Sequence, residues 1–474
     1  MALVILIDFV LLIGLVYLTV SKGLEAALPF FVFVTILVPG ESAIPLPGLF
    51  GLTTQRFAVM VLIVLYLVFG RRGPVEQRNV PTPLKLLLIL NLAWNILSAV
   101  ESIDPILSAK QLISIIFEYY VVYYIFYRTI STQQSIEKIL KAMVASMAAT
   151  VVFGSIESYS GWSVITWFPQ AAYRFTLENE DISYRTHSTF PHAILYGGAL
   201  AMVIPQILYL IAKAQSKARR LALWIMCLPM FLCLYKSQSR GPWLAAIFGC
   251  LLVFLLTSKK VRKYMLFIAC LSAAVLIIRP GVYDTIAESY AVTFMPEHPK
   301  GSSYEYRYAL MDVAKTALAR STDRMLWGYG QESFYYLHLT GPFLGKPDHK
   351  FESCDSTWIQ SMVETGYVGF GIFALMLGTA AWFTLRNVWR LPEPAKFLSW
   401  IFFVNLIQYY FLMMSVAIYS WGQNGYMLWF VIAMSMAYPK VMGAATDEEV
   451  RAGGLNQTLG TAKVLSVARS RSSS

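Results

Sequence analysis

The chain has 474 residues, of which 57% are hydrophobic and only 14% are charged, and its mean hydropathy is +0.56. Soluble domains carry about 25% charged residues, and a soluble fold could not bury this much apolar surface. The formal net charge of +11 could suggest a nucleic-acid partner, but the basic residues stand in short clusters between apolar runs, which argues against one. Such clusters are typical of the cytoplasmic loops of membrane proteins. We therefore expect an all-α polytopic membrane protein that binds no nucleic acid.

Apolar stretches of about 20 residues, the length that crosses a ~30 Å hydrocarbon core, recur along the chain. They begin near residues 2, 25, 55, 84, 110, 138, 192, 220, 241, 262, 357, 397 and 420. The second and third are short, and one of them could be a re-entrant or tilted element, so we predict about 12–13 transmembrane helices. The first stretch lacks a basic start and a small-residue cleavage site, which indicates a retained helix and not a signal peptide.

The distribution of lysine and arginine predicts the topology. Basic residues cluster in every second connection, at residues 22, 71–78, 128–141, 213–220, 259–263 and 386–396. The positive-inside rule assigns these connections to the cytoplasm. Two long connections, at about 158–190 and 280–356, then lie on the extracytoplasmic side.

These boundaries divide the chain into five predicted regions. They are N-terminal transmembrane helices at 1–157, central transmembrane helices with a first outer loop at 158–279, a large extracytoplasmic loop at 280–356, C-terminal transmembrane helices at 357–442 and a disordered cytoplasmic tail at 443–474.

The large loop should contain a helix, because its apolar residues have helical periodicity. These residues are Leu310, Val313, Ala314, Ala317 and Leu318. We expect a surface helix that lies on the membrane bundle. A turn at Gly328 and Gly330, and then a loop rich in Tyr, His, Gly and Pro, should follow it.

No motif of a familiar soluble enzyme is present in the sequence, which has no phosphate-binding glycine loop, zinc-protease motif or nucleophile elbow. The five cysteines show neither metal nor disulfide spacing. We therefore expect no metal site and no cofactor. The residues that stand out instead are cationic and polar side chains at the predicted outer ends of the helices.

Three arginines are candidates for an anion site. Arg240 lies in the turn "KSQSRGPW" and either reaches to lipid headgroups or clamps a phosphate, since guanidinium matches phosphate oxygens in a planar, bidentate way. Arg307 lies in the first turn of the predicted loop helix, so it is either a solvated charge or an anion ligand near a helix N-terminus. Arg185 either pairs with the acidic residues at 178–181 or joins the same site.

Three histidines and one aspartate lie near these arginines in the predicted topology. His187, His192 and His349 are either ordinary loop histidines or part of the site. Asp355 stands where "DSTW" begins a helix, and Asp is a favoured N-cap residue. Capping and catalysis are compatible roles for this carboxylate.

Three blocks of sequence carry a family resemblance. They are "YRTHSTFPHAILYGGALAMVIPQ" at 184–206, "SQSRGPWLAAIFG" at 237–249, and the run from "YRYALMDVAKTAL" through "LWGYGQESF" to "DSTWIQSMVETGYVGFGIFALML". In this order they resemble the O-antigen ligase/polymerase superfamily of bacterial envelope polysaccharide enzymes. The family's Glu-x-Gly-x-x-Gly signature corresponds to Glu364, Gly366 and Gly369.

One position departs from the family pattern. The superfamily usually has a histidine followed by Asn or Ser where this chain has Asp355 followed by Ser356, and the nearest histidine is His349. Either Asp355 or His349 is the base, or the protein has a different acceptor or is inactive. Histidine titrates closer to neutrality and would suit a base better.

The resemblance implies a function. Members of the superfamily transfer a glycan from an undecaprenyl diphosphate carrier to an acceptor hydroxyl on another glycan or a lipid, at the periplasmic face. It implies a multi-pass enzyme of the bacterial inner membrane, surrounded by membrane lipids, that acts as ligase or polymerase in O-antigen, capsule or exopolysaccharide assembly. The implied roles are diphosphate binding by Arg185, Arg240 and Arg307, base catalysis by Asp355 or His349, and substrate contact by His192 and His187.

The alternative is a transporter of an anion such as bicarbonate, or of polysaccharide, with the arginines as a permeation site. Transporters usually place charged sites near the membrane midplane and often contain two repeated halves. The sequence has no obvious repeat, and its candidate cations cluster at one predicted face. This pattern favours the enzyme.

Overall fold

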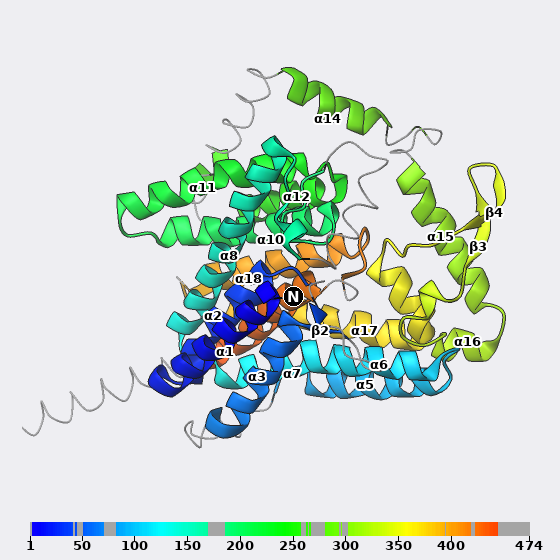
Figure 1. Ribbon diagram of the computed structural model, residues 1–474, viewed down its shortest axis with the longest axis horizontal. Coiled ribbons are helices and arrows are strands. Elements are labelled where there is room, and N and C mark those ends of the chain that lie inside the picture. The colour runs from blue at the N-terminus through cyan, green and yellow to red at the C-terminus, as the bar shows by residue number, and fades with distance from the viewer. Residues whose placement is uncertain are drawn as a thin grey trace, which may run out of the picture.

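Apolar helices that pack side by side make up almost all of the protein (Figure 1). The computed structural model describes residues 2–40, 43–44, 51–70, 82–168, 185–256, 262–263, 265–266, 280–292, 295, 302–393, 395–418 and 422–443. Within these residues, seven helices are long and apolar enough to cross a membrane, and four shorter apolar helices accompany them. The predicted all-α polytopic class is therefore confirmed.

The long helices are α1 (Ala2–Lys22), the continuous segment Pro105–Thr129, α8 (Gln133–Ser160), α10 (Ala193–Lys213), α11 (Lys217–Lys236), α17 (Thr357–Arg390) and α18 (Ala395–Leu412). The segment Pro105–Thr129 consists of α6 (Pro105–Ile115), the π-helix η2 (Ile116–Tyr120) and α7 (Val121–Thr129). The shorter apolar helices are α2 (Leu24–Leu37), α3 (Thr54–Phe69), α5 (Lys85–Val100) and α12 (Arg240–Leu256). Residues 422–443 are also helical.

The expected apolar stretches agree with these helices. Almost every stretch begins within a few residues of a helix start. The stretch near residue 262 falls mostly outside the described residues, and so does the predicted tail after residue 443. An apolar run becomes a helix in a membrane because the helix satisfies every backbone polar group within the segment.

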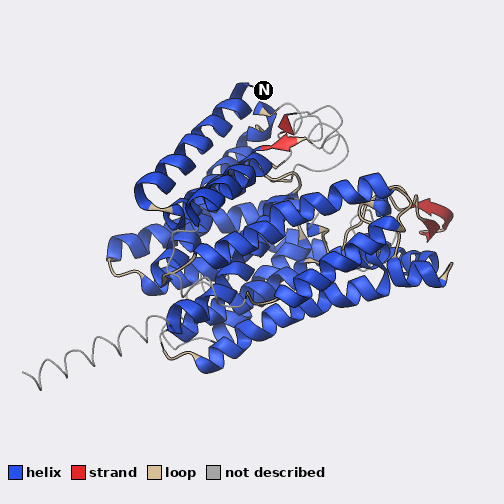
Figure 2. Cartoon of the chain, turned by 90° about the horizontal axis from the view of Figure 1, so that it is seen from below, coloured by secondary structure: helices blue, strands red, loops and turns tan. Residues whose placement is uncertain are grey.

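Burial separates central helices from peripheral ones. In α10, 94% of the most apolar window is buried inside the protein, compared with 28% in α1 and 22% in α11. Helix α1 turns large apolar side chains outward, and Phe9 and Tyr17 are 58% and 65% exposed. Exposed apolar stripes of this kind face lipid, so α10 forms the centre of the bundle and α1 and α11 its edge. Figure 2 shows the N-terminal helix along one side of the bundle.

A polar contact inside the bundle holds α12 against α18. Gln408 of α18 donates from Nε2 to the carbonyl oxygen of Ala245 at 2.9 Å. Gly249 leaves the space for this carboxamide, because a Cβ atom there would overlap the Gln408 side chain. Small residues and interhelical hydrogen bonds of this kind bring membrane helices together. The contact fixes the position of α12, whose first residue is Arg240.

The large loop contains more regular structure than predicted. It comprises α14 (Pro280–Val292), α15 (Ser302–Leu318), α16 (Thr322–Trp327), the short 3-10 helix η4 (Ser333–Tyr335), and a hairpin of β3 (Thr340–Phe343) and β4 (Lys346–Lys350). The expected surface helix is α15, which buries Leu310 and Ala314 as its apolar stripe predicts and contacts α17. The hairpin replaces the irregular loop that we expected.

The strands lie only at the periphery of the described structure (Figure 2). Strands β3 and β4 are antiparallel, and Gly341 pairs with His349. A second small pair, β1 (Ala43–Ile44) and β2 (Leu52–Thr53), lies just before α3. The two hairpins leave the helical core uninterrupted.

The Glu-x-Gly-x-x-Gly signature marks a kink where the large loop is attached to α17. Gly366 has φ 69° and ψ −177° inside this helix. The kink leaves two helix carbonyls open to the loop, so that Tyr329 N donates to Val363 O at 3.0 Å and Gly330 N donates to Glu364 O at 2.8 Å. The predicted turn at residues 328–330 therefore crosses α17 at its kink. This attachment holds the loop close to the start of α17, where Asp355 and its neighbours lie.

Candidate functional site

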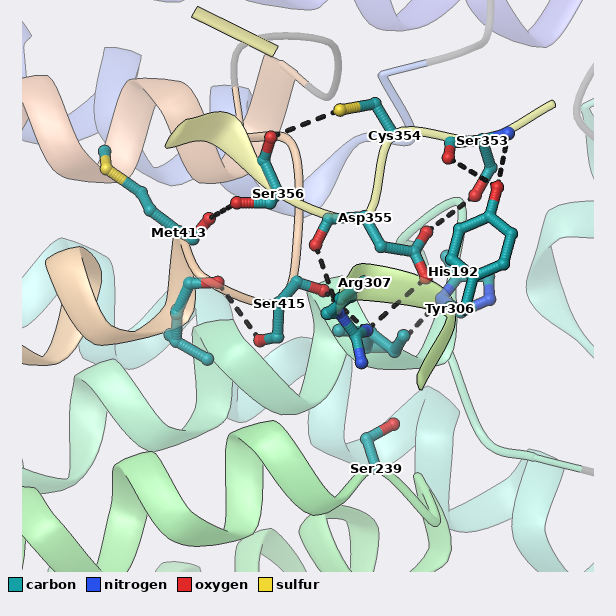
Figure 3. Close-up of polar contacts among 12 residues, drawn as sticks. His192, Ser239, Tyr306, Arg307, Ser353, Cys354, Asp355, Ser356, Met413 and Ser415 are labelled. Atoms are coloured by element: carbon teal, nitrogen blue, oxygen red, sulfur yellow. Dashed lines mark hydrogen bonds and ion pairs between the residues drawn. The ribbon is translucent and has the colours of Figure 1, made fainter. Parts of the chain in front are cut away.

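Arg307 and Asp355 form an ion pair where α15 meets the start of α17 (Figure 3). Arg307 Nη2 lies 3.4 Å from Asp355 Oδ2, and the guanidinium also donates to the carbonyl oxygens of Asp355 and Ser415, each at 3.4 Å. These distances are longer than the usual 2.7–3.2 Å of an N–H···O bond. Both side chains are partly exposed, by 24% and 34%. The contacts of the guanidinium with Asp355 and Ser415 are therefore weak ones.

Asp355 does not cap α17, which corrects one of the two roles considered for it. Ser356 is the N-cap residue, and its Oγ accepts from Ile359 N at 3.5 Å. The Asp355 carboxylate is instead turned toward side chains of the loop, and Ser353 Oγ donates to Asp355 Oδ1 at 2.6 Å. The carboxylate is therefore not needed to start the helix.

The other two predicted arginines lie in the same cluster. Arg185 donates from Nε to Ser237 O at 3.0 Å and from Nη2 to Ser239 Oγ at 2.6 Å. Ser239 directly precedes Arg240, the first residue of α12. Arg240 in turn is close enough to Arg307 to be repelled by its positive charge. The acidic residues at 178–181, which were the alternative partners of Arg185, lie outside the described residues.

The cluster gathers positive charge from three parts of the chain that are far apart in the sequence. Three guanidinium groups come together from the segment before α10, the start of α12 and the loop helix α15. Asp355 is the one carboxylate whose ion pair with them is found in the described part of the chain. A partly exposed group of cations is suited to bind an anion with several oxygens, such as a phosphate or diphosphate.

His187 belongs to a buried hydrogen-bond network, and its contact with substrate stays a prediction. Its side chain is buried, and both ring nitrogens have partners, with Nδ1 3.0 Å from Phe190 O and Nε2 3.4 Å from Glu157 Oε1. Glu157 Oε2 also accepts from the backbone N–H of His187 and of Ser188, at 3.2 and 2.6 Å. This network fixes the loop that follows Arg185.

His192 stands beside the arginines as a neutral ring. It is the N-cap of α10, where Nδ1 accepts from Ile194 N at 3.1 Å. Burial, together with the charges of Arg185 and His187, lowers the pKa of His192 to about 4. Because Nδ1 accepts a hydrogen bond, the single ring proton is on Nε2 at neutral pH. His192 can therefore offer one N–H donor but no positive charge.

His349 and Asp355 border the same open depression, of about 540 Å³, on the loop. His349 lies on β4 and its ring packs against Phe343, with ring centroids 4.7 Å apart. The remaining lining residues are Tyr306, Lys350, Glu352 and Ser353. The two candidate bases, His349 and Asp355, therefore line the same depression, together with aromatic and charged side chains.

Three residues of the site had no signal in the sequence. Tyr306 donates from its hydroxyl to Ser353 O at 2.9 Å and accepts from Ser353 N at 3.3 Å. Ser353 in turn holds Asp355, and Ser415 offers its carbonyl oxygen to Arg307. The Tyr306–Ser353 pair is separated by 47 residues and the Arg307–Ser415 pair by 108 residues. Only the tertiary fold brings such residues together.

The central segment of the chain matches a known protein family. Residues 221–374, about a third of the chain, match the family model described as O-antigen ligase. The predicted resemblance to the O-antigen ligase/polymerase superfamily is confirmed. No curated protein matches the chain. The O-antigen ligase segment contains Arg240, Arg307, His349 and Asp355, whereas Arg185 lies before it.

The match of this segment to the O-antigen ligase family supports a role as a membrane glycan ligase or polymerase, and hence as a transferase. It also favours the transferase over the transporter that was the alternative. The described residues contain no group of three His, Cys, Asp or Glu side chains that could hold a metal ion.

Proposed function

We propose that this protein is a membrane glycosyltransferase that moves a glycan from undecaprenyl diphosphate to an acceptor hydroxyl. The observation that carries the proposal is the ion pair of Arg307 with Asp355 beside Arg240, all within the O-antigen ligase segment. We place the reaction at the extracytoplasmic face of the bacterial inner membrane. The cluster lies at helix ends that the positive-inside rule assigns to that face.

The arginines would bind the diphosphate of the donor. When the glycosidic bond to the carrier breaks, the leaving diphosphate gains one negative charge. Preorganised cations that meet this charge stabilise the transition state more than the ground state. Arg240 and Arg307 come from different elements, so they can approach the diphosphate from two sides. The Arg185 guanidinium, fixed by Ser237 and Ser239, would complete the cradle.

Asp355 would accept the proton of the attacking hydroxyl. In the structure its carboxylate is shared between Arg307 and Ser353. The long bonds to Arg307 would be exchanged for bonds from Arg307 to the diphosphate when the donor binds. The carboxylate, still held by Ser353, then no longer neutralises Arg307 and can act as a general base. Donor binding would in this way prepare the base.

The reaction itself is a single displacement. The acceptor oxygen attacks the anomeric carbon of the donor sugar, and the bond between that carbon and the diphosphate oxygen breaks. The hydroxyl proton passes to Asp355, and undecaprenyl diphosphate leaves with the electron pair. The anomeric configuration is inverted, because only one attack takes place.

The depression lined by Tyr306, Phe343 and His349 would receive the acceptor glycan. Sugar rings present apolar C–H faces that pack on aromatic rings, and hydroxyl groups that bond to polar side chains at the edge of a pocket. Asp355 borders this depression and also contacts Arg307. It could therefore reach the attacking hydroxyl of an acceptor held in the depression.

The test is transfer by the purified full-length chain in lipid nanodiscs, with an undecaprenyl diphosphate-linked glycan as donor. We expect glycosylated acceptor and free undecaprenyl diphosphate in equal amounts by mass spectrometry. Arg307→Ala should abolish both products, whereas Arg320→Ala, which removes an exposed arginine just after α15, should not. Uptake of bicarbonate or polysaccharide into proteoliposomes without any transfer would refute the proposal.

The same assay distinguishes ligase from polymerase. Elongation of the donor with no added acceptor identifies a polymerase. A product that forms only when a lipid or lipid-linked core acceptor is added identifies a ligase.

A further inference from the structure

A second polar site lies where the N-terminal helices meet the large loop and the helical residues 422–443. It is a cavity of about 170 Å³. Polar side chains from four parts of the chain line it: Gln55 and Arg56 of α3, Gln111 of α6, Glu118 of η2, Glu332 of the large loop and Tyr426 of the helical residues 422–443. Apart from Glu332, these residues lie outside the O-antigen ligase segment.

An ion pair forms one wall of the cavity. Arg56 Nε lies 2.7 Å from Glu118 Oε1, and the Tyr426 hydroxyl donates to Glu118 Oε2 at 3.0 Å. Glu118 lies in the π-helix η2, and π-helical turns occur frequently at functional sites. The pair fixes a guanidinium and a carboxylate at the cavity surface, so the wall offers both a donor group and an acceptor group.

The rest of the lining has an excess of acceptors. Gln55 is 1% exposed, and its Nε2 donates to Val38 O at 2.7 Å, but its Oε1 has no hydrogen-bond partner in the described part of the chain. A buried amide oxygen is rarely left without a donor. The Glu332 carboxylate is likewise without an ion pair among the described residues, and burial raises its pKa. A ligand of this cavity must therefore supply several O–H or N–H donors.

We infer that this cavity binds one monosaccharide residue of a glycan, an inference that rests on the proposed function for its biological ligand. A sugar ring supplies hydroxyl donors to Gln55 and Glu332 and accepts from Arg56. The rings of Tyr119 and Tyr426, with centroids 5.5 Å apart, add apolar surface for its C–H faces. The volume fits a single sugar ring. Arg56 excludes a metal ion from this site, and the two carboxylates exclude a diphosphate.

A smaller cavity lies next to this site, in the direction of the start of α17. It has a volume of about 40 Å³, and Ile115 lines both cavities. Its other walls include Gln331, which is adjacent to Glu332, and Thr357, which follows Asp355 by two residues. The sugar site and the start of α17 are therefore near one another, and the glycan that supplies the sugar would be either the donor or the acceptor of the proposed reaction.

Binding of monosaccharides to the full-length chain in detergent tests the inference. The probes are glucose, galactose and N-acetylglucosamine, and the readout is saturation-transfer NMR. At least one probe should bind, and Glu332→Gln and Gln111→Ala should each weaken binding by about tenfold, the loss expected for one hydrogen bond to a charged or buried polar group. Glu101→Gln removes an exposed carboxylate at the end of α5 and should leave binding unchanged. Equal melting temperatures would show that the variants are folded.

The result separates the inference from the proposed function. Arg307→Ala should abolish transfer and leave monosaccharide binding intact. Binding without any transfer by the wild-type chain would reject the proposed function and keep the sugar site. No binding of any probe, or equal binding by Glu332→Gln and the wild type, would overturn the inference whether or not transfer occurs. Competition by the undecaprenyl diphosphate-linked glycan assigns the cavity to the donor, and competition by the acceptor glycan assigns it to the acceptor.

Discussion

Ser353 Oγ donates to Asp355 Oδ1 at 2.6 Å, a shorter bond than any that Arg307 makes to the same residue. The backbone of Ser353 is in turn bound to the Tyr306 hydroxyl on α15. The carboxylate therefore has one firm partner and one weak one. When a diphosphate draws Arg307 away, Ser353 would still hold Asp355 in place at the edge of the acceptor depression.

Asp355→Asn should lower kcat by about 10²–10⁴, because the amide cannot take the proton of the acceptor hydroxyl. The melting temperature should stay near that of the wild type, since Ser356 and not Asp355 caps α17. Initial rates in the nanodisc assay and thermal unfolding measure the two effects. Wild-type activity of the Asn variant would eliminate Asp355 as the base.

His349→Ala provides the matching test for the other candidate base. The His349 ring lines the acceptor depression and packs on Phe343. If Asp355 is the base, His349→Ala should raise the KM for the acceptor and leave kcat within about tenfold of the wild type, because only acceptor binding is weakened. A drop of kcat as large as that expected for Asp355→Asn, at saturating acceptor, would transfer the role of base to His349.

Arg240→Ala should lower kcat/KM for the donor by about 10²–10³, the usual effect of removing one preorganised group that stabilises transition-state charge. Arg240→Lys should recover only part of the loss, because lysine keeps the charge but not the bidentate geometry. Arg219→Ala, which removes an exposed arginine at the start of α11, serves as the control. Equal rates for Arg240→Ala and Arg219→Ala would exclude Arg240 from donor binding.

Stability should fall as the pH is lowered from about 6.5 to 4, in part because of His192. The pKa of this histidine is lowered to about 4 in the folded protein, so the unfolded chain binds a proton on it first. Stability rises with pH wherever the unfolded state binds more protons. His192→Asn keeps an N-cap acceptor for α10 and removes the titration. Melting temperatures of the variant should depend less on pH in this window than those of the wild type, and parallel curves would contradict the assignment.

Membrane helices were predictable because each is a local property of the chain. A run such as Ala193–Lys213 has to be helical in a bilayer whatever packs against it. The apolar stripe that predicted α15 is also a local property of the chain, because it depends only on the helical spacing of its apolar residues. The hairpin β3–β4 carries no such local signal, because its strands are short and exposed and lack strict alternation of polar and apolar residues.

The candidate site was predictable only in part, for a related reason. The sequence signal was a charged residue at the end of an apolar run, because charges beside membrane segments are costly and often functional. Such residues are Arg240, Arg307 and Asp355. His187 carried the same signal, but its partner Glu157 is a buried carboxylate near the end of α8, 30 residues before it. The cavity at Arg56 and Glu118 escaped notice because its walls come from segments that only the fold brings together.

Gly366→Ala should reduce the free energy of unfolding by roughly 2–4 kcal/mol. The φ of 69° at Gly366 disfavours any residue with a Cβ atom, and that atom would also overlap the carbonyl oxygen of Leu326. Because the overlapping atoms belong to the backbone of α16 and of the turn after it, this part of the loop would have to move away from α17. Thermal unfolding of the purified variant measures the loss.

Gly371→Ala is the matched control, in the same helix. No atom lies within 4 Å of the position where its Cβ would stand, and the residue is exposed. Its melting temperature should therefore equal or slightly exceed that of the wild type, because alanine favours the helix. If the loop is displaced by Gly366→Ala, Asp355 and Arg307 should also separate, so transfer should fall in this variant and persist in Gly371→Ala. Similar stability and activity of the two variants would mean that the kink does not hold the loop at the site.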